Sequence, residues 1–166
     1  VRQALTERTG RLAREGVLPI GLMGRMWQEQ LVETLVPVRT EWLRLGLRFP
    51  QPAPKLALSL DLDGLRLDDW IDRLRTDGQQ SAWLMQLSSK VLDRQGRPRG
   101  DKLIGPWLRQ LAGAAAGHRI AGYLVARDAV LDMAPLEQAD SLAVLRDLAR
   151  LWRANLDKPL PVACRT

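Results

Sequence analysis

The hydrophobic period of this sequence changes from about 3.6 residues to 2 near residue 55, which favours a fold that combines helices with a sheet. Before that point, apolar side chains recur at helical spacing from about Leu22 to Leu45. After it, "KLALSLDL" (55–62) alternates apolar and polar residues, and the following Asp63–Gly64 is a strong signal for a tight hairpin turn. The chain therefore enters a sheet from a long helical segment.

Four helices are expected. Residues 1–15 form a charged helix that Gly16 ends, and residues 22–45 form a second, which Pro37 should kink or split. A third runs over about 102–116, and a fourth follows Pro135, with leucines and a tryptophan along one face.

Five strands are expected between the second helix and the fourth. Residues 65–76 should pair with 55–62, and a second Asp-Gly turn at 77–78 should lead to a third strand over 81–89, which gives an antiparallel meander. A short hairpin follows in 118–135, turning near Asp128, whereas 90–102 has no apolar period and is predicted to be a loop. The element order is that of an α+β domain.

Length and composition suit one globular domain. The chain has 166 residues, a formal charge of +6 and a pI near 10.4, which favours nucleic acid as a partner, although a solvated arginine-rich surface explains the charge equally well. It begins with Val1 rather than Met, so we expect the C-terminal fragment of a longer chain. No stretch is long and apolar enough to cross a membrane, and the single Cys164 favours a reducing cytoplasm.

Four segments in order resemble one family. They are "AREGVLPIGLMG", "LDGLRLDDWIDRL", "GPWLRQLAGAAAG" and "LWRANLDKPLPVA", and with their spacing they resemble the C-terminal domain of the exodeoxyribonuclease V gamma subunit, RecC. The resemblance runs from about residue 8 to the end. It implies a restriction-endonuclease-like core of the PD-(D/E)XK type, in which a β-meander and a short hairpin are flanked by four helices. Residues 1–50 would be a helical entry segment and 55–166 the nuclease-like core.

The same resemblance implies that the catalytic set of active relatives has been lost here. Those relatives carry an Asp on the second core strand and Asp-x-Lys on the third. "DWIDRL" supplies Asp72, but Gln86 and Ser88 stand at the later acid and lysine, and the region around Gln28 and Glu29 lacks the histidine of the relatives. A shift of two residues would bring Lys90 to the lysine position and still leave the acid missing.

Such losses matter because cleavage of a phosphodiester by this route needs a divalent ion held by carboxylates. A glutamine amide is a poor substitute for a carboxylate, and serine offers no cation for the transition state. Asp68, Asp69 and Asp77 are alternative acids, but the first two point to opposite faces of a strand and the third lies in a turn. We interpret Asp72 as a strand acid paired with Arg73 or Arg66, and predict neither a catalytic residue nor a metal site.

Other chemistry-bearing residues have simpler interpretations. The loop 90–102 has a positive excess that would suit phosphate contacts, or would simply be solvated; its cations are Lys90, Arg94, Arg97, Arg99 and Lys102. Tryptophans on helix faces are expected in the core (Trp27, Trp42, Trp107, Trp152), and Trp83 either stacks a base or packs inside. His118 alone makes no zinc site, and Cys164 is expected to be inert.

The resemblance implies a non-catalytic domain of a RecBCD-type helicase–nuclease. It would serve subunit assembly and DNA strand separation and guidance in double-strand break repair by homologous recombination. Its partners would be the beta (RecB-like) and alpha (RecD-like) subunits and DNA. The domain itself would need no cofactor, and Mg and ATP would act only at partner subunits. Two alternatives remain open: an active Mg-dependent DNA nuclease with a rearranged site, and a free-standing basic DNA-binding module.

Overall fold

The computed structural model describes residues 1–157 of the chain and shows an α+β fold with four helices and two sheets. The helices are α1 (Arg2–Arg14), α2 (Leu22–Arg48), α3 (Gly100–Ala115) and α4 (Gln138–Asp157). The strands are β1 (Gln51–Pro52), β2 (Leu56–Leu62), β3 (Leu65–Ile71), β4 (Leu74–Thr76), β5 (Ser81–Gln86), β6 (Ile120–Val125) and β7 (Val130–Met133).

The larger sheet has five strands in the order β1-β4-β5-β6-β7. Its central pair, β5 and β6, is parallel, and the other neighbours are antiparallel. A parallel pair needs a crossover connection, and α3 supplies it. The smaller sheet is the β2–β3 hairpin, whose tip is the expected Asp63–Gly64 turn, with both residues at positive φ.

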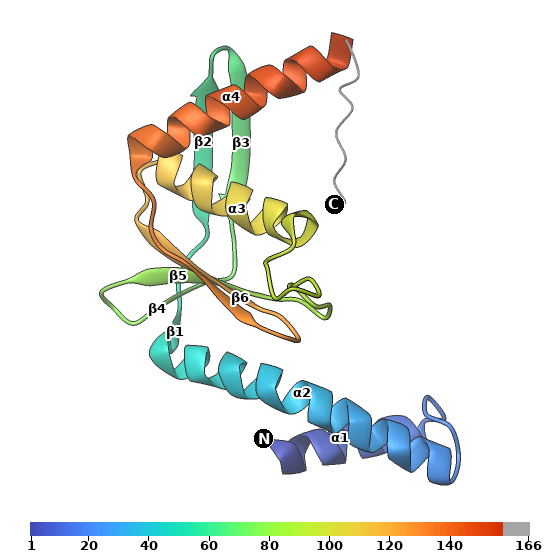
Figure 1. Cartoon of the computed structure of the whole chain (residues 1–166). Coiled ribbons are helices and arrows are strands. Elements are labelled where there is room, and N and C mark those ends of the chain that lie inside the picture. Colours follow the sequence, from blue (N-terminus) through green and yellow to red (C-terminus); the bar gives the residue numbers. More distant parts are fainter. Residues whose placement is uncertain (158–166) are drawn as a thin grey trace.

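Helices cover both faces of the larger sheet (Figure 1). On one face, α3 packs against β6, and the buried Trp83 ring lies so close to β6 that a Cβ at Gly122 would come within 2.1 Å of it. On the other face, Val38, Leu45 and Phe49, from α2 and the residue after it, join a buried cluster with Leu84 and Tyr123. The glycine at 122 is thus required by a close approach of a ring to the backbone.

The smaller sheet and α4 form a further layer beyond α3 (Figure 1). Alternate residues of β2 are buried in the cluster that also contains Leu111 of α3 and Leu145 of α4. The helix α3 consequently lies between two apolar layers. This explains the continuous burial of α3 from Gln110 to Ala115.

The predicted meander is wrong in one respect. Residues 65–76 are not a single strand, because the chain leaves the hairpin after Ile71 and joins the other sheet at Leu74. The break falls at Asp72–Arg73, where Arg73 adopts a φ of 56°, and β4 rather than β3 pairs with β5. The predicted third strand over 81–89 also ends earlier, at Gln86.

The helices agree better with prediction. α2 continues through Pro37 without being split, and Pro37 lies on its exposed side. α1 packs along the first part of α2, and the two form an arm that extends away from the sheets (Figure 1). This arm carries part of the candidate site described below.

Candidate functional site

Asp72 is bound by an arginine of α3. Its Oδ1 accepts a hydrogen bond from Arg109 Nη1 at 2.7 Å, and Arg73 Nε lies 3.8 Å from its Oδ2. The hydrogen bond from Arg109 holds the pKa of the Asp72 carboxyl below its usual range; burial opposes this, and the positive charges of Arg109 and Arg73 add to the lowering. The predicted pairing with Arg73 is therefore present but secondary, and Arg66 pairs instead with Asp68.

The structure does not bring Asp72 together with Gln86 and Ser88. The Leu84 amide donates to the Arg73 carbonyl at 3.2 Å, which sets Asp72 beside Met85 in the register of β4 and β5. Met85 packs on the α3 side, where Asp72 meets Arg109, and its strand neighbour Gln86 points to the opposite face. Gln86 there lines a hollow with residues of α1 and α2.

Gln86 and Ser88 belong to a groove beneath α2. Both line one hollow together with Leu35, Val38 and Arg127. Glutamine and serine side chains donate and accept hydrogen bonds, and the nearby guanidinium is a cation, so this lining suits an anion better than a metal ion. In the part of the chain that the structure describes, no group of three His, Cys, Asp or Glu side chains could hold a metal ion.

The predicted loop 90–102 ends earlier than expected, because α3 begins at Gly100, and it is more ordered than its composition indicates. The Asp128 carboxylate accepts hydrogen bonds from the backbone amides of Val91 (2.8 Å) and Leu92 (3.2 Å). These bonds hold the loop against the turn between β6 and β7. Leu92 and Pro98 form a β-bridge, and Val91 is completely buried. The segment is thus a small closed loop fixed at its base.

Three of the five cations of this loop are already paired. Arg97 forms an ion pair with Asp93 at 3.2 Å. The Asp101 carboxylate forms ion pairs with both Arg99, at 2.9 Å, and Lys102, at 3.7 Å. Lys90 and Arg94 are exposed, and no ion pair of theirs occurs among the described residues. The loop therefore presents less free positive charge than its sequence indicates.

Several tryptophans that were predicted to be buried are exposed. Trp83 is fully buried and donates from Nε1 to Gln110 Oε1 at 2.8 Å, so it cannot stack a base without unfolding the sheet. Trp42 packs on the α2 cluster as expected. Trp27, Trp107 and Trp152 were expected inside but are 53%, 40% and 52% exposed. His118 lies partly buried just before β6, and Cys164 lies outside the described residues.

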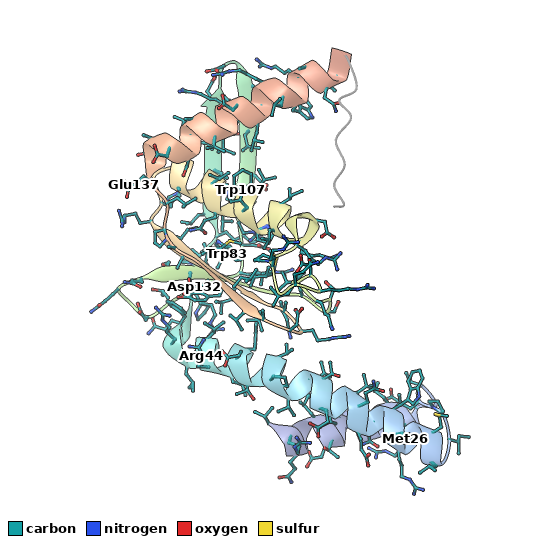
Figure 2. The ribbon with its side chains drawn as sticks, in the orientation of Figure 1. Met26, Arg44, Trp83, Trp107, Asp132 and Glu137 are labelled. Atoms are coloured by element: carbon teal, nitrogen blue, oxygen red, sulfur yellow. The ribbon has the colours of Figure 1, made fainter. Side chains whose placement is uncertain are left out.

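The tip of the arm is strongly apolar. Around the connection between α1 and α2, large hydrophobic side chains are exposed, with Ile20 at 97% and Leu22 at 68%. We call this set the arm-tip patch; it consists of Val17, Ile20, Leu22, Met23, Met26 and Trp27. Met26 marks its position at the far end of α2 in Figure 2. So many neighbouring apolar side chains are unusual on an isolated soluble domain and indicate a contact surface.

Sequence reasoning missed the partners that decide these roles. Arg109 and Gln110 interrupt an apolar helix, "GPWLRQLAGAAAG", and polar residues at such positions signal a buried hydrogen bond. The arm-tip patch left a weaker signal, since its spacing is also that of a core-facing helix.

A model of the RecC C-terminal domain family matches residues 1–166, the whole chain. The chain belongs to the RecC C-terminal domain family. This family associates it with the gamma subunit of exodeoxyribonuclease V, with the RecBCD complex and its other subunits, and with DNA repair or recombination.

Other comparisons add little to the RecC assignment. Among solved structures, the chain is similar to the one described as the crystal structure of SSO0001, with a TM-score of 0.39 and 15% identity over 90% of this chain and 74% of that chain. A similarity this low supports no conclusion about function. No curated protein sequence matches the chain. Within residues 1–157, no helix is long and apolar enough to span a membrane.

Proposed function

We propose that this RecC C-terminal domain acts without catalysis in a RecBCD-type helicase–nuclease. It would help to assemble the gamma subunit with the beta and alpha subunits, and would guide DNA strands after their separation. It would act in double-strand break repair by homologous recombination, in the cytoplasm, with Mg and ATP used at the other subunits. We treat residues 1–166 as one domain with a restriction-endonuclease-like core, and the sheet with α2 on one face and the crossover α3 on the other supports that fold.

The absence of catalysis is supported by the surroundings of Asp72. Its carboxylate already binds the Arg109 guanidinium at 2.7 Å, and the neutral Gln86 points to the other face of the sheet. A magnesium ion would have to displace that arginine and then find further carboxylates. We therefore expect no cleavage of DNA by the chain in Mg²⁺ or Mn²⁺, whether Asp72 is present or replaced by Ala.

The arm-tip patch is the observation that carries the assembly role. Its side chains are exposed by 53% to 97%, and they include a tryptophan and two methionines, residue types that are common in the centres of protein interfaces. The patch lies at the end of an arm, away from both sheets (Figure 1). A protein partner can therefore reach it without disturbing the body of the domain.

The decisive experiment is assembly of the three subunits with an altered arm tip. We expect Ile20→Ser, Met26→Ser and Trp27→Ser, combined in the full gamma subunit, to lower co-purification of the beta or alpha subunit by at least about tenfold, since buried hot-spot residues each contribute about 2 kcal/mol. The matched control is Leu47→Ser, an apolar side chain that is 82% exposed on the same helix but lies outside the arm-tip patch. Normal assembly of the triple variant would refute the proposed surface.

A further inference from the structure

The groove beneath α2 is lined by three arginines whose side chains have no partner among residues 1–157. Arg8 lies on α1, Arg39 on α2 and Arg127 just after β6, and all three are exposed. Within residues 1–157 their guanidinium groups make no hydrogen bond, ion pair or ring contact, whereas Arg2, Arg44 and Arg109 are held by acids. Unpaired like charges around one groove repel one another unless an anion lies between them.

These arginines share one continuous groove. A hollow of about 370 Å³ between α1, α2 and β5 includes Arg8, Arg39 and Gln86. A second hollow of about 320 Å³ shares Leu35, Val38 and Gln86 with it and adds Ser88 and Arg127. A third, of about 260 Å³, shares Val38 and Arg127 and reaches the turn between β6 and β7.

The groove crosses the carboxyl ends of the parallel strands β5 and β6. Gln86 is the last residue of β5, and Arg127 follows Val125, the last residue of β6, by two. In α/β sheets, ligands commonly bind outside the carboxyl ends of parallel strands, where loops and helix ends leave a crevice. The position of the groove thus matches a general binding position of such sheets.

The residues that line the groove suit the phosphates of a nucleic-acid backbone. Two carboxylates, Glu41 and Asp128, lie only at the third hollow; Glu41 binds Arg44, and Asp128 accepts the two amides of the 90–102 loop. The rest offers guanidinium groups, the neutral Gln86 and Ser88, and an aliphatic floor that includes Leu5, Leu35 and Leu43. Arginines placed along an elongated groove suit the backbone of a nucleic acid, and aliphatic side chains suit its sugars and unstacked bases.

We propose that this groove binds the sugar–phosphate backbone of a single DNA strand through Arg8, Arg39 and Arg127. The inference rests on the proposed role in strand guidance and assigns that role to a particular surface. We assign a single strand rather than a duplex because the aliphatic floor of the groove can contact unstacked bases, which a duplex does not expose. Gln86 and Ser88, at the positions of a lost acid and lysine, would hydrogen-bond the same strand.

The first test measures binding of a labelled oligo-dT by the 166-residue chain at several salt concentrations. We expect Arg8→Gln, Arg39→Gln and Arg127→Gln, combined, to reduce affinity at least about tenfold. The slope of log affinity against log salt should fall by about 2, since each single-strand phosphate contact contributes about 0.7. Matched neutralisation of Arg11, Arg14 and Arg25, exposed arginines of α1 and α2 outside the groove, should change affinity by less than about twofold.

Three results would overturn the proposal: an unchanged slope in the groove variant, an equal loss in the control variant, or equally tight binding of a blunt duplex of the same length. The substituted arginines are exposed, so unchanged thermal melting should show that each variant remains folded.

A second test places the strand in the assembled RecBCD complex. With Cys164 replaced by Ser, Ser88→Cys carrying a photoreactive group should crosslink to one DNA strand, and the groove arginine variant should abolish that crosslink. Ser59→Cys, on the exposed face of the β2–β3 hairpin, is the control and should give none. If complexes assemble through the arm tip but show no crosslink at position 88, the proposal that the groove binds DNA is refuted. The assembly role is then unaffected.

Discussion

Gln110 is a buried amide that joins three parts of the fold. Its Oε1 accepts from Trp83 Nε1 at 2.8 Å, and its Nε2 donates to the carbonyls of Ile120 at 2.7 Å and Ala134 at 2.9 Å. One side chain of α3 thereby satisfies groups on β5, on β6 and in the segment before α4. Buried polar groups that lose such partners are costly, because water cannot replace them.

We therefore predict that Gln110→Met destabilises the protein by roughly 2–4 kcal/mol, since it preserves volume while leaving a buried indole N–H and a buried carbonyl unpaired. Urea denaturation followed by circular dichroism measures this loss. Gln138→Met is the matched control, because Gln138 is exposed and donates a hydrogen bond to the Ala115 carbonyl at 3.1 Å. A loss no larger than that of the control would show that Gln110 is not an essential link.

Asp72 should make stability depend on pH. Arg109 lowers the pKa of its carboxyl in the folded state, so the folded protein binds the proton less readily than the unfolded chain. The stabilisation is present above the ordinary aspartate pKa of about 3.9 and is lost as the pH falls through the lower, folded value. Because the Asp72 side chain is 39% exposed, we expect the gain to be below about 1 kcal/mol.

Asp72→Asn tests this pH dependence. The variant should be slightly less stable than the parent at neutral pH, and the difference should shrink toward zero in acid as Asp72 of the parent becomes protonated. Chemical denaturation across the acid range measures it, with Asp132→Asn, an exposed acid on β7, as the control. A constant difference across that range would mean that Asp72 acts through its shape rather than its charge.

At the scale of elements, the β2–β3 hairpin is fastened to α4 by its turn. The Asp63 carboxylate lies 3.3 Å from Arg146 Nε and 3.6 Å from Arg150 Nη2. The backbone carbonyl of Asp63 accepts a hydrogen bond from Arg153 Nη1 at 2.9 Å. These three arginines recur along one face of α4 and converge on the hairpin tip. The turn that begins the smaller sheet is therefore also its link to the last helix.

Asp63→Asn should separate these two roles of the turn. Asparagine tolerates the positive φ of 56° at this position, so the hairpin should persist while its charge is lost. We predict that the free energy of unfolding falls by about 0.5 kcal/mol, because both partners are partly exposed. In a double-mutant cycle, Asp63→Asn should cost much less when Arg146→Met is already present. Additive losses in that cycle would contradict a direct interaction between the turn and α4.

For the whole molecule, the sequence predicts elements better than their pairing. The helices, the Asp63–Gly64 hairpin and the α+β class follow from local period and turn chemistry, and the structure confirms them. The change of sheet at Asp72–Arg73 was not predicted. The apolar alternation does lapse over residues 68–73, but such a lapse does not show which sheet the next strand joins, and Arg73 is not a residue type that normally marks positive φ. The parallel β5–β6 pair depends on contacts made through α3, which no local pattern records.

The candidate site shows the same division. From the sequence we predicted that Gln86 and Ser88 occupy positions that lack catalytic chemistry, and that the loop 90–102 is basic. It could not show that Asp72 and Gln86 face opposite sides of the sheet, because that depends on the register of β4 with β5. Nor could it show that Arg8 and Arg127, more than a hundred residues apart, line hollows that share Gln86.

The position of α3 between two layers has a consequence for cooperativity. The larger sheet rests on one side of α3, and the β2–β3 hairpin and α4 rest on the other. If α3 detached, both layers would expose their apolar faces to water at once, so neither can open alone at low cost. α1 packs mainly on α2 and can fray without that penalty, which leaves the tip of the arm free to adjust its shape to a partner while the body stays rigid.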